Sequence, residues 1–147
     1  MAADALVDTG AILALMDGTN RWHEVCVDTF QQLRLPLVTS EAVLTEVFHC
    51  SATTSRNGDR LEVQRSGAIR LAVIEDSELS GIQTLMLHYW DRPMDFADAT
   101  LVYLARREGL STVFTVDHAD FNTYRIAGRK RFRILPAIGR RESPSDP

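Results

Sequence analysis

The sequence predicts an α/β fold in which a mainly parallel sheet lies between two layers of helices, a three-layer α/β/α sandwich. Short apolar runs typical of buried strands alternate with longer segments whose apolar residues recur at helical spacing. The connections between successive strands are too long for hairpins, so helical crossovers are expected to join strands that run parallel. No internal repeat or low-complexity tract interrupts this alternation.

The first half of the chain is expected to contain two strands and three helices. Pro36 ends the second helix because proline lacks the backbone donor that a helix interior needs. Ser40 is a suitable N-cap for the third helix, whose apolar stripe is formed by Val43, Val47 and Cys50. The expected elements are a strand at 5–7, helices at 11–16 and 22–33, a strand at 37–39 and a helix at 40–50.

The second half repeats the pattern after a polar loop at 51–59 that contains Asn57-Gly58. One helix is expected to turn Leu79, Ile82, Leu85 and Met86 inward, and the next to end at Gly109 as a C′ residue. The expected elements are helices at 61–69, 77–89 and 95–107 and strands at 71–74, 112–116 and 132–135.

Composition predicts one globular domain at 1–138, followed by a disordered tail at 139–147. The 147 residues are 45% hydrophobic and 24% charged, which is ordinary for a soluble domain. Cys26 and Cys50 lack metal-ligand or Cys-x-x-Cys spacing and are expected to be buried thiols. Without a basic leader or a long apolar run, no membrane segment and a cytoplasmic location are expected.

The net charge of −4 argues against a general nucleic-acid binder, but the charge is unevenly distributed. Positive residues gather near the C-terminus, where Arg129, Lys130 and Arg131 form a run that either contacts RNA phosphates or is simply solvated. A metal ion held by clustered acidic residues would also offset part of the negative charge.

Two aspartates follow apolar strands directly. Asp8 comes after the first strand, and Asp117 comes after the strand at 112–116. Ligands of parallel α/β sheets bind beyond the carboxyl ends of the strands, so both carboxylates are expected at the edge where a site forms. The alternative for each residue is that it only caps the helix or turn that follows.

Two further acids lie on apolar helix faces. Glu46 lies on the same predicted helix face as Val43, Val47 and Cys50. Asp98 shares a predicted helix face with the residues three, four and seven positions later, which are Leu101, Val102 and Ala105. A charge on an apolar face is costly unless it is paired or bound to metal. Alternatively, Glu46 pairs with a distant arginine, and Asp98 only stabilises the dipole of its helix.

Carboxylates brought together in this way favour a divalent cation with an all-oxygen shell, Mg²⁺ or Mn²⁺ rather than Zn²⁺. Such cations activate water and stabilise the leaving oxygen in phosphodiester hydrolysis. His118 adjoins Asp117 and could be a general base, but a surface or capping role is the simpler interpretation.

Three segments resemble the motifs of PIN domains and occur in the same order. The resemblance covers residues 5 to 135. Val7-Asp8-Thr9-Gly10-Ala11 resembles the family's opening motif, Met94-Asp95-Phe96-Ala97-Asp98 resembles its third, and Thr115-Val116-Asp117-His118-Ala119-Asp120-Phe121 resembles its closing motif. The most similar subgroup is that of the VapC-like toxins of bacterial toxin–antitoxin pairs.

The resemblance implies a metal-dependent endoribonuclease that cuts tRNA, rRNA or mRNA. It implies Asp8, Glu46, Asp98 and Asp117 as metal-binding and catalytic acids, with Thr115 orienting the last of them. Thr9, Asp95 and Asp120 would be supporting residues. It also implies a homodimer held inactive by a small antitoxin. An RNA-processing nuclease without an antitoxin, or a catalytically silent PIN-like binding module, would carry the same pattern.

Two other enzyme classes share single features with this sequence. Asp8-Thr9-Gly10 and Ile138-Gly139-Arg140 resemble elements of retroviral-type aspartic proteases, but the helical periods at 40–50, 77–89 and 95–107 disagree with that nearly all-β fold. A phosphatase with an aspartyl nucleophile would need a second aspartate at position 10, which is glycine.

Overall fold

The computed structural model describes residues 5–50 and 66–137. In this part of the chain five strands form one sheet in the order β3-β2-β1-β4-β5, and every neighbouring pair is parallel. The strands are β1 (Leu6–Val7), β2 (Leu37–Thr39), β3 (Ile69–Leu71), β4 (Thr112–Phe114) and β5 (Arg133–Leu135). The predicted parallel sheet is therefore confirmed.

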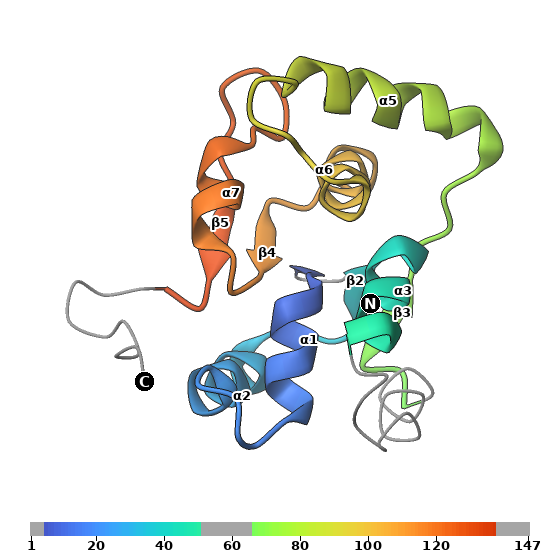
Figure 1. Cartoon of the computed structure of the whole chain (residues 1–147). Coiled ribbons are helices and arrows are strands. Elements are labelled where there is room, and N and C mark those ends of the chain that lie inside the picture. Colours follow the sequence, from blue (N-terminus) through green and yellow to red (C-terminus); the bar gives the residue numbers. More distant parts are fainter. Residues whose placement is uncertain (1–4, 51–65, 138–147) are drawn as a thin grey trace.

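Helices cover both faces of this sheet. In Figure 1, α5 and α6 lie above the strands, and α1 and α2 lie below them. The helical elements are α1 (Thr9–Met16), α2 (His23–Gln32), α3 (Glu41–Cys50), the 3-10 turn η1 (Asp76–Glu78), α5 (Leu79–His88), α6 (Phe96–Glu108) and α7 (His118–Thr123). This arrangement confirms the α/β/α sandwich and excludes the nearly all-β fold of the aspartic protease alternative.

The strand β1 lies at the centre of the sheet, and this position accounts for the apolar run directly before Asp8. Leu6 pairs with Val38 on one side and with Val113 on the other, and all three side chains are buried. Because helices pack on both faces, each position of a central strand is inside the core. Burying each such side chain stabilises the fold by about 1.5–3 kcal/mol.

The order of the strands creates a switch point between β1 and β4. The chain runs outward from β1 through β2 to β3, then crosses back to place β4 on the other side of β1. The carboxyl ends of the strands at such a switch point are where α/β proteins bind ligands.

Helix α6, which crosses back toward β4, has well-defined ends. Asp95 is its N-cap and accepts a hydrogen bond from the Asp98 backbone N–H at 2.8 Å. Gly109 ends the helix in the left-handed region at φ 69°, as expected for a C′ glycine. Most of the helix between these caps is buried, so its first turn is held firmly beside the switch point.

Several local predictions are wrong. The third strand lies at Ile69–Leu71 and not at 71–74. It is an edge strand in which Ile69 is buried and Arg70 is exposed, so it does not show the continuous apolar run used to predict it. In the apolar run that suggested the later position, Val73 is 64% exposed. Leu79 was expected inside but is exposed.

Other expectations fare unevenly. Cys26 is buried as expected, whereas Cys50 is exposed; both thiols are free. The turn expected after Asp117 is the helix α7. The predicted loop at 51–59, residues 61–65 of the predicted helix at 61–69 and the predicted tail at 139–147 lie outside the described residues. The rest of that helix is wrong, because residues 66–68 form a turn and Ile69 begins β3. None of the helices in the described ranges is long and apolar enough to cross a membrane.

Candidate metal centre

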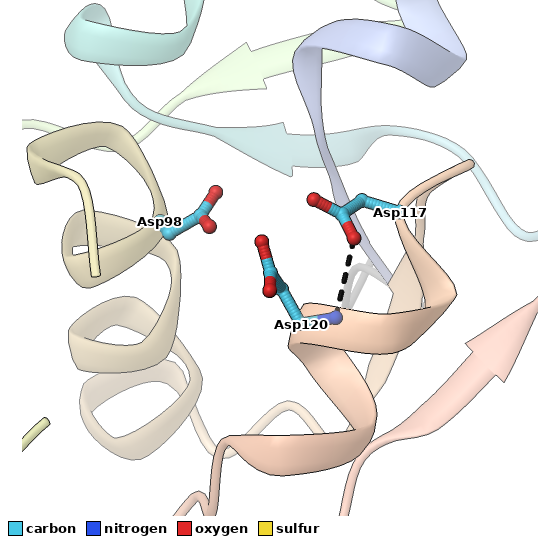
Figure 2. Close-up of side chains that lie close together, drawn as sticks. All are labelled: Asp98, Asp117 and Asp120. Carbon is cyan, nitrogen blue, oxygen red and sulfur yellow. Dashed lines mark hydrogen bonds between the residues drawn. The ribbon is translucent and has the colours of Figure 1, made fainter. Parts of the chain in front are cut away.

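Three aspartate side chains converge beyond the carboxyl ends of β1 and β4. One carboxylate oxygen from each of Asp98, Asp117 and Asp120 lies within 4.8 Å of the others. Figure 2 shows Asp98 reaching from α6 toward Asp117 and Asp120, which come from the start of α7. These three residues are called the aspartate cluster below.

Asp8 lies next to this cluster at the end of β1 and is almost fully buried. Its two carboxylate oxygens accept hydrogen bonds from the Thr9 backbone N–H at 2.8 Å and from the Thr115 hydroxyl at 2.9 Å. Burial raises the pKa of Asp8 to about 6, with a smaller contribution from the charge of Glu46, although both hydrogen bonds oppose the shift. Asp8 is therefore a carboxylate whose charge the metal-free protein only partly stabilises.

Asp98 is perturbed more strongly. The residue is 7% exposed, and its carboxylate accepts a hydrogen bond from the Tyr124 hydroxyl at 2.9 Å. Burial, followed by the charges of Asp8 and Asp95, raises the pKa of Asp98 to about 8. Strong shifts of this kind in neighbouring carboxylates are characteristic of functional sites.

Thr115 connects the two strand-end aspartates. Its hydroxyl donates to Asp8 Oδ2 and accepts a hydrogen bond from the Asp117 backbone N–H at 2.9 Å. Gly10 allows the start of α1 to approach this point, because a Cβ at position 10 would collide with the side chain of Val116. The local geometry therefore favours glycine after Asp8 and Thr9.

Asp117 and Asp120 are held by the first turn of α7. Asp117 is the N-cap and accepts from the Asp120 backbone N–H at 3.2 Å, the contact drawn in Figure 2. Burial and the neighbouring charge of Asp120 raise the pKa of Asp117. Arg92 lies at the rim, with its guanidinium 3.6 Å from Asp120. The capping role expected as an alternative for Asp117 thus coexists with its place in the cluster.

The donor set suits a hard divalent cation. The three clustered side chains offer carboxylate oxygens, which Mg²⁺ and Mn²⁺ prefer. Within residues 5–50 and 66–137, no lysine or arginine forms an ion pair with Asp8, Asp98 or Asp117. Buried carboxylates without a cationic partner repel one another, and a bound cation would remove that repulsion.

Comparison with known proteins identifies the family. The family model described as the PIN domain matches residues 5–127. The chain belongs to the PIN-domain family. All four predicted acids and the aspartate cluster fall within the matched residues.

Individual relatives agree with this assignment. The chain is 30% identical over 134 residues to ribonuclease VapC26 of Mycobacterium tuberculosis, covering 89% of this chain and 99% of that protein. Its fold is similar to the crystal structure of VapC20 from the same species, described as a sarcin–ricin loop cleaving toxin. That likeness has a TM-score of 0.70 and 18% identity, over 79% of this chain and 92% of the other.

In this PIN domain the sequence-predicted acids are not equally placed. Asp98 and Asp117 are in the aspartate cluster, Asp8 adjoins it, and Asp120, expected as a supporting residue, is a full member. Glu46 projects from α3 as a half-buried residue, and its carboxylate accepts a hydrogen bond from the Thr9 hydroxyl at 2.9 Å. It lies on the Asp8 side of the site, outside the cluster. The role of each acid as a metal ligand stays a prediction.

Two neighbours of the PIN-domain acids were not foreseen from the sequence. Tyr124 and Arg92 contact Asp98 and Asp120, and neither lies at a spacing that signals this. His118 faces structural partners instead of the acids. Its ring nitrogens lie 3.2 Å from the Val116 carbonyl and 2.7 Å from the Pro136 carbonyl. The histidine thus links the start of α7 to the end of β5, a structural role that differs from the surface or capping role expected and from that of a general base.

The basic run forms an exposed turn between α7 and β5. Arg125 and Arg131 form an antiparallel bridge, and Gly128 adopts φ 56° within the turn. Arg129, Lys130 and Arg131 are exposed. This segment, residues 125–131, is called the basic turn below.

Proposed function

We propose that this PIN domain is an endoribonuclease that depends on Mg²⁺ or Mn²⁺ and is the toxin of a VapBC-type pair. The observation that carries the proposal is the convergence of Asp98, Asp117 and Asp120 beside the buried Asp8 at the sheet's switch point. Membership of the PIN family and 30% identity to ribonuclease VapC26 support RNA as the substrate.

In this proposal the acids have two different roles at the cation. Asp98, Asp117 and Asp120 bind the cation directly, while Asp8 and Glu46 complete its surroundings from the β1 side, with Thr9 joining these two residues. The bound cation supplies Lewis-acid chemistry for phosphodiester hydrolysis. Without a cation the acidic site would repel the phosphate, so the same residues make RNA binding depend on metal.

The basic turn is proposed to hold the RNA backbone outside the site. Arg129, Lys130 and Arg131 are exposed, and the turn follows α7, the helix that carries Asp117 and Asp120. Side chains of this kind bind phosphates without reading bases.

The proposed partners follow from the VapC-like relatives. We expect a homodimer and a cognate antitoxin protein that blocks the acidic site. Expression of the chain alone should arrest bacterial growth, and co-expression of a short reading frame adjacent to its gene should restore it. A chain that never arrests growth but still cuts RNA would instead be an RNA-processing nuclease without an antitoxin.

The decisive assay is cleavage of structured RNA by the purified protein. Cleavage should require Mg²⁺ or Mn²⁺, stop with EDTA and return when metal is added in excess. Asp8→Asn and Asp98→Asn should each abolish cleavage while the protein stays folded. Cleavage that persists in EDTA would refute the metal mechanism. RNA binding without turnover under any metal would identify a silent binding module.

A further inference from the structure

Tyr124 combines an apolar setting with one polar contact at the site. The residue follows α7 directly and is 1% exposed. Its ring packs edge-on against the rings of Phe121 and Tyr89, with centroids 5.3 Å apart in both pairs. At the end of this buried ring, the hydroxyl donates to Asp98 Oδ2 at 2.9 Å. A buried tyrosine hydroxyl needs a partner, and this one has a carboxylate of the aspartate cluster.

Several contacts fix the backbone that carries this ring. The Tyr124 backbone N–H donates to the Asp120 carbonyl at 3.1 Å, which ties the residue to α7. The next N–H, that of Arg125, donates to the Tyr89 hydroxyl at 2.9 Å. Tyr124 therefore extends rigidly from the helix that holds Asp117 and Asp120 to Asp98 on α6. Its hydrogen bond joins the two elements whose acids form the cluster.

The contact restricts a carboxylate that could otherwise rotate. The terminal torsion of aspartate has a broad energy profile, so packing of Cβ does not fix the plane of the carboxylate. One hydrogen bond to Oδ2 uses one of about four lone-pair positions on the carboxylate and leaves the others for a cation. Partners of this type orient metal ligands, and their loss commonly weakens metal binding about 10–100-fold.

We propose that Tyr124 is a positioning residue for the metal centre, holding the Asp98 carboxylate in the orientation that faces Asp117 and Asp120. The inference rests on the proposed function, since it takes the aspartate cluster as the binding site of a divalent cation. Tyr124 acts through Asp98 and has no contact with substrate in this role.

The test is Tyr124→Phe, which keeps the ring packing and removes the hydroxyl. Mn²⁺ affinity, measured by calorimetry or by the spectroscopic signal of free Mn²⁺, should fall about 10-fold. The metal concentration for half-maximal RNA cleavage should rise by the same factor, while kcat at saturating metal is largely kept. Tyr103→Phe is the matched control, because the Tyr103 hydroxyl also donates to a carboxylate, that of Glu78 at 3.0 Å. It should leave Mn²⁺ affinity unchanged.

Each outcome separates this inference from the proposed function. A folded Tyr124→Phe protein with wild-type Mn²⁺ affinity, alongside an Asp98→Asn protein that has lost it, overturns only the positioning role. Wild-type Mn²⁺ affinity in Asp98→Asn overturns the proposed metal centre itself. If Tyr124→Phe does not fold, the Mn²⁺-bound structure of the wild-type protein decides. A Tyr124 hydroxyl that has moved off the Asp98 carboxylate in that structure contradicts the inference.

Discussion

The Thr115 hydroxyl donates a hydrogen bond to Asp8 Oδ2 across 107 positions of sequence, at 2.9 Å. The contact exists because β1 and β4 are parallel neighbours, with Val7 in register with Phe114. The residues that follow the two strands therefore lie side by side. Since Thr115 also accepts from the Asp117 backbone, one hydroxyl sets the positions of two aspartates.

Thr115→Val should therefore reduce RNA cleavage by more than the loss of folded protein alone would cause. Removing the hydroxyl leaves a buried carboxylate with one fewer partner, at a cost to stability of about 1–3 kcal/mol. Cleavage at limiting metal should fall at least about 10-fold, as when other partners of metal ligands are removed. The measurements are RNA cleavage rate and thermal unfolding of the same preparation.

Thr39→Val provides the control. Thr39 is equally buried, and its hydroxyl donates to the Val7 backbone carbonyl at 2.9 Å instead of to a carboxylate. It should lose comparable stability and keep its metal dependence. Equal losses of activity in both variants would show that Thr115 contributes only to the fold.

The stability of the metal-free protein should fall as pH rises. In the unfolded chain aspartate ionises near about pH 4, whereas burial and neighbouring charges raise the pKa of Asp8 to about 6 and that of Asp98 to about 8. The folded protein thus binds more protons than the unfolded chain across this window. Its relative stability is full below about pH 4 and is lost as pH rises through the folded pKa values. The Tm measured in EDTA should decrease from acidic to mildly alkaline pH.

Two comparisons check the cause of this pH dependence. Asp98→Asn should flatten the decrease, because it removes the carboxyl with the larger shift. Excess Mg²⁺ should also flatten it, since a cation stabilises the ionised form. A Tm in EDTA that rises steadily between about pH 5 and pH 8 would contradict the assigned shifts.

Asp120 and Glu46 should differ in their effect on metal binding. Asp120 belongs to the aspartate cluster, whereas the carboxylate of Glu46 is engaged by the Thr9 hydroxyl on the Asp8 side. Asp120→Asn should therefore lower Mn²⁺ affinity more than Glu46→Gln does. Titration calorimetry on both variants gives the comparison, and the reverse order would make Glu46 the closer ligand.

Neutralising the basic turn should weaken RNA binding without touching the metal site. Replacing Arg129, Lys130 and Arg131 by alanine should raise KM. If each residue contacts one phosphate, the dependence of log affinity on log salt concentration should also become less steep, by about 2–3 in slope. Arg70→Ala is the control, because Arg70 lies on β3 at the opposite edge of the sheet. An unchanged salt slope in the triple variant would mean that the turn is only a solvated surface.

The sequence predicted those parts of the site that depend on local pattern. Asp8 and Asp117 could be placed because each ends an apolar strand, and Asp98 because it interrupts an apolar helix face. Asp120 and Tyr124 come close to Asp98 only through the tertiary placement of α7 relative to α6, which no local spacing encodes. The position of β3 was missed for a related reason, since only the completed sheet shows that Arg70 points to solvent while Val73 lies beyond the strand.

The most direct test of the metal centre is the anomalous scattering of Mn²⁺ in crystals of the wild-type protein. We predict a peak about 2.0–2.3 Å from carboxylate oxygens of Asp98 and Asp117, with Asp120 beside it, that disappears in Asp98→Asn. An actively RNA-cleaving protein whose crystals show no Mn²⁺ at these residues, or show it only elsewhere, would contradict the account.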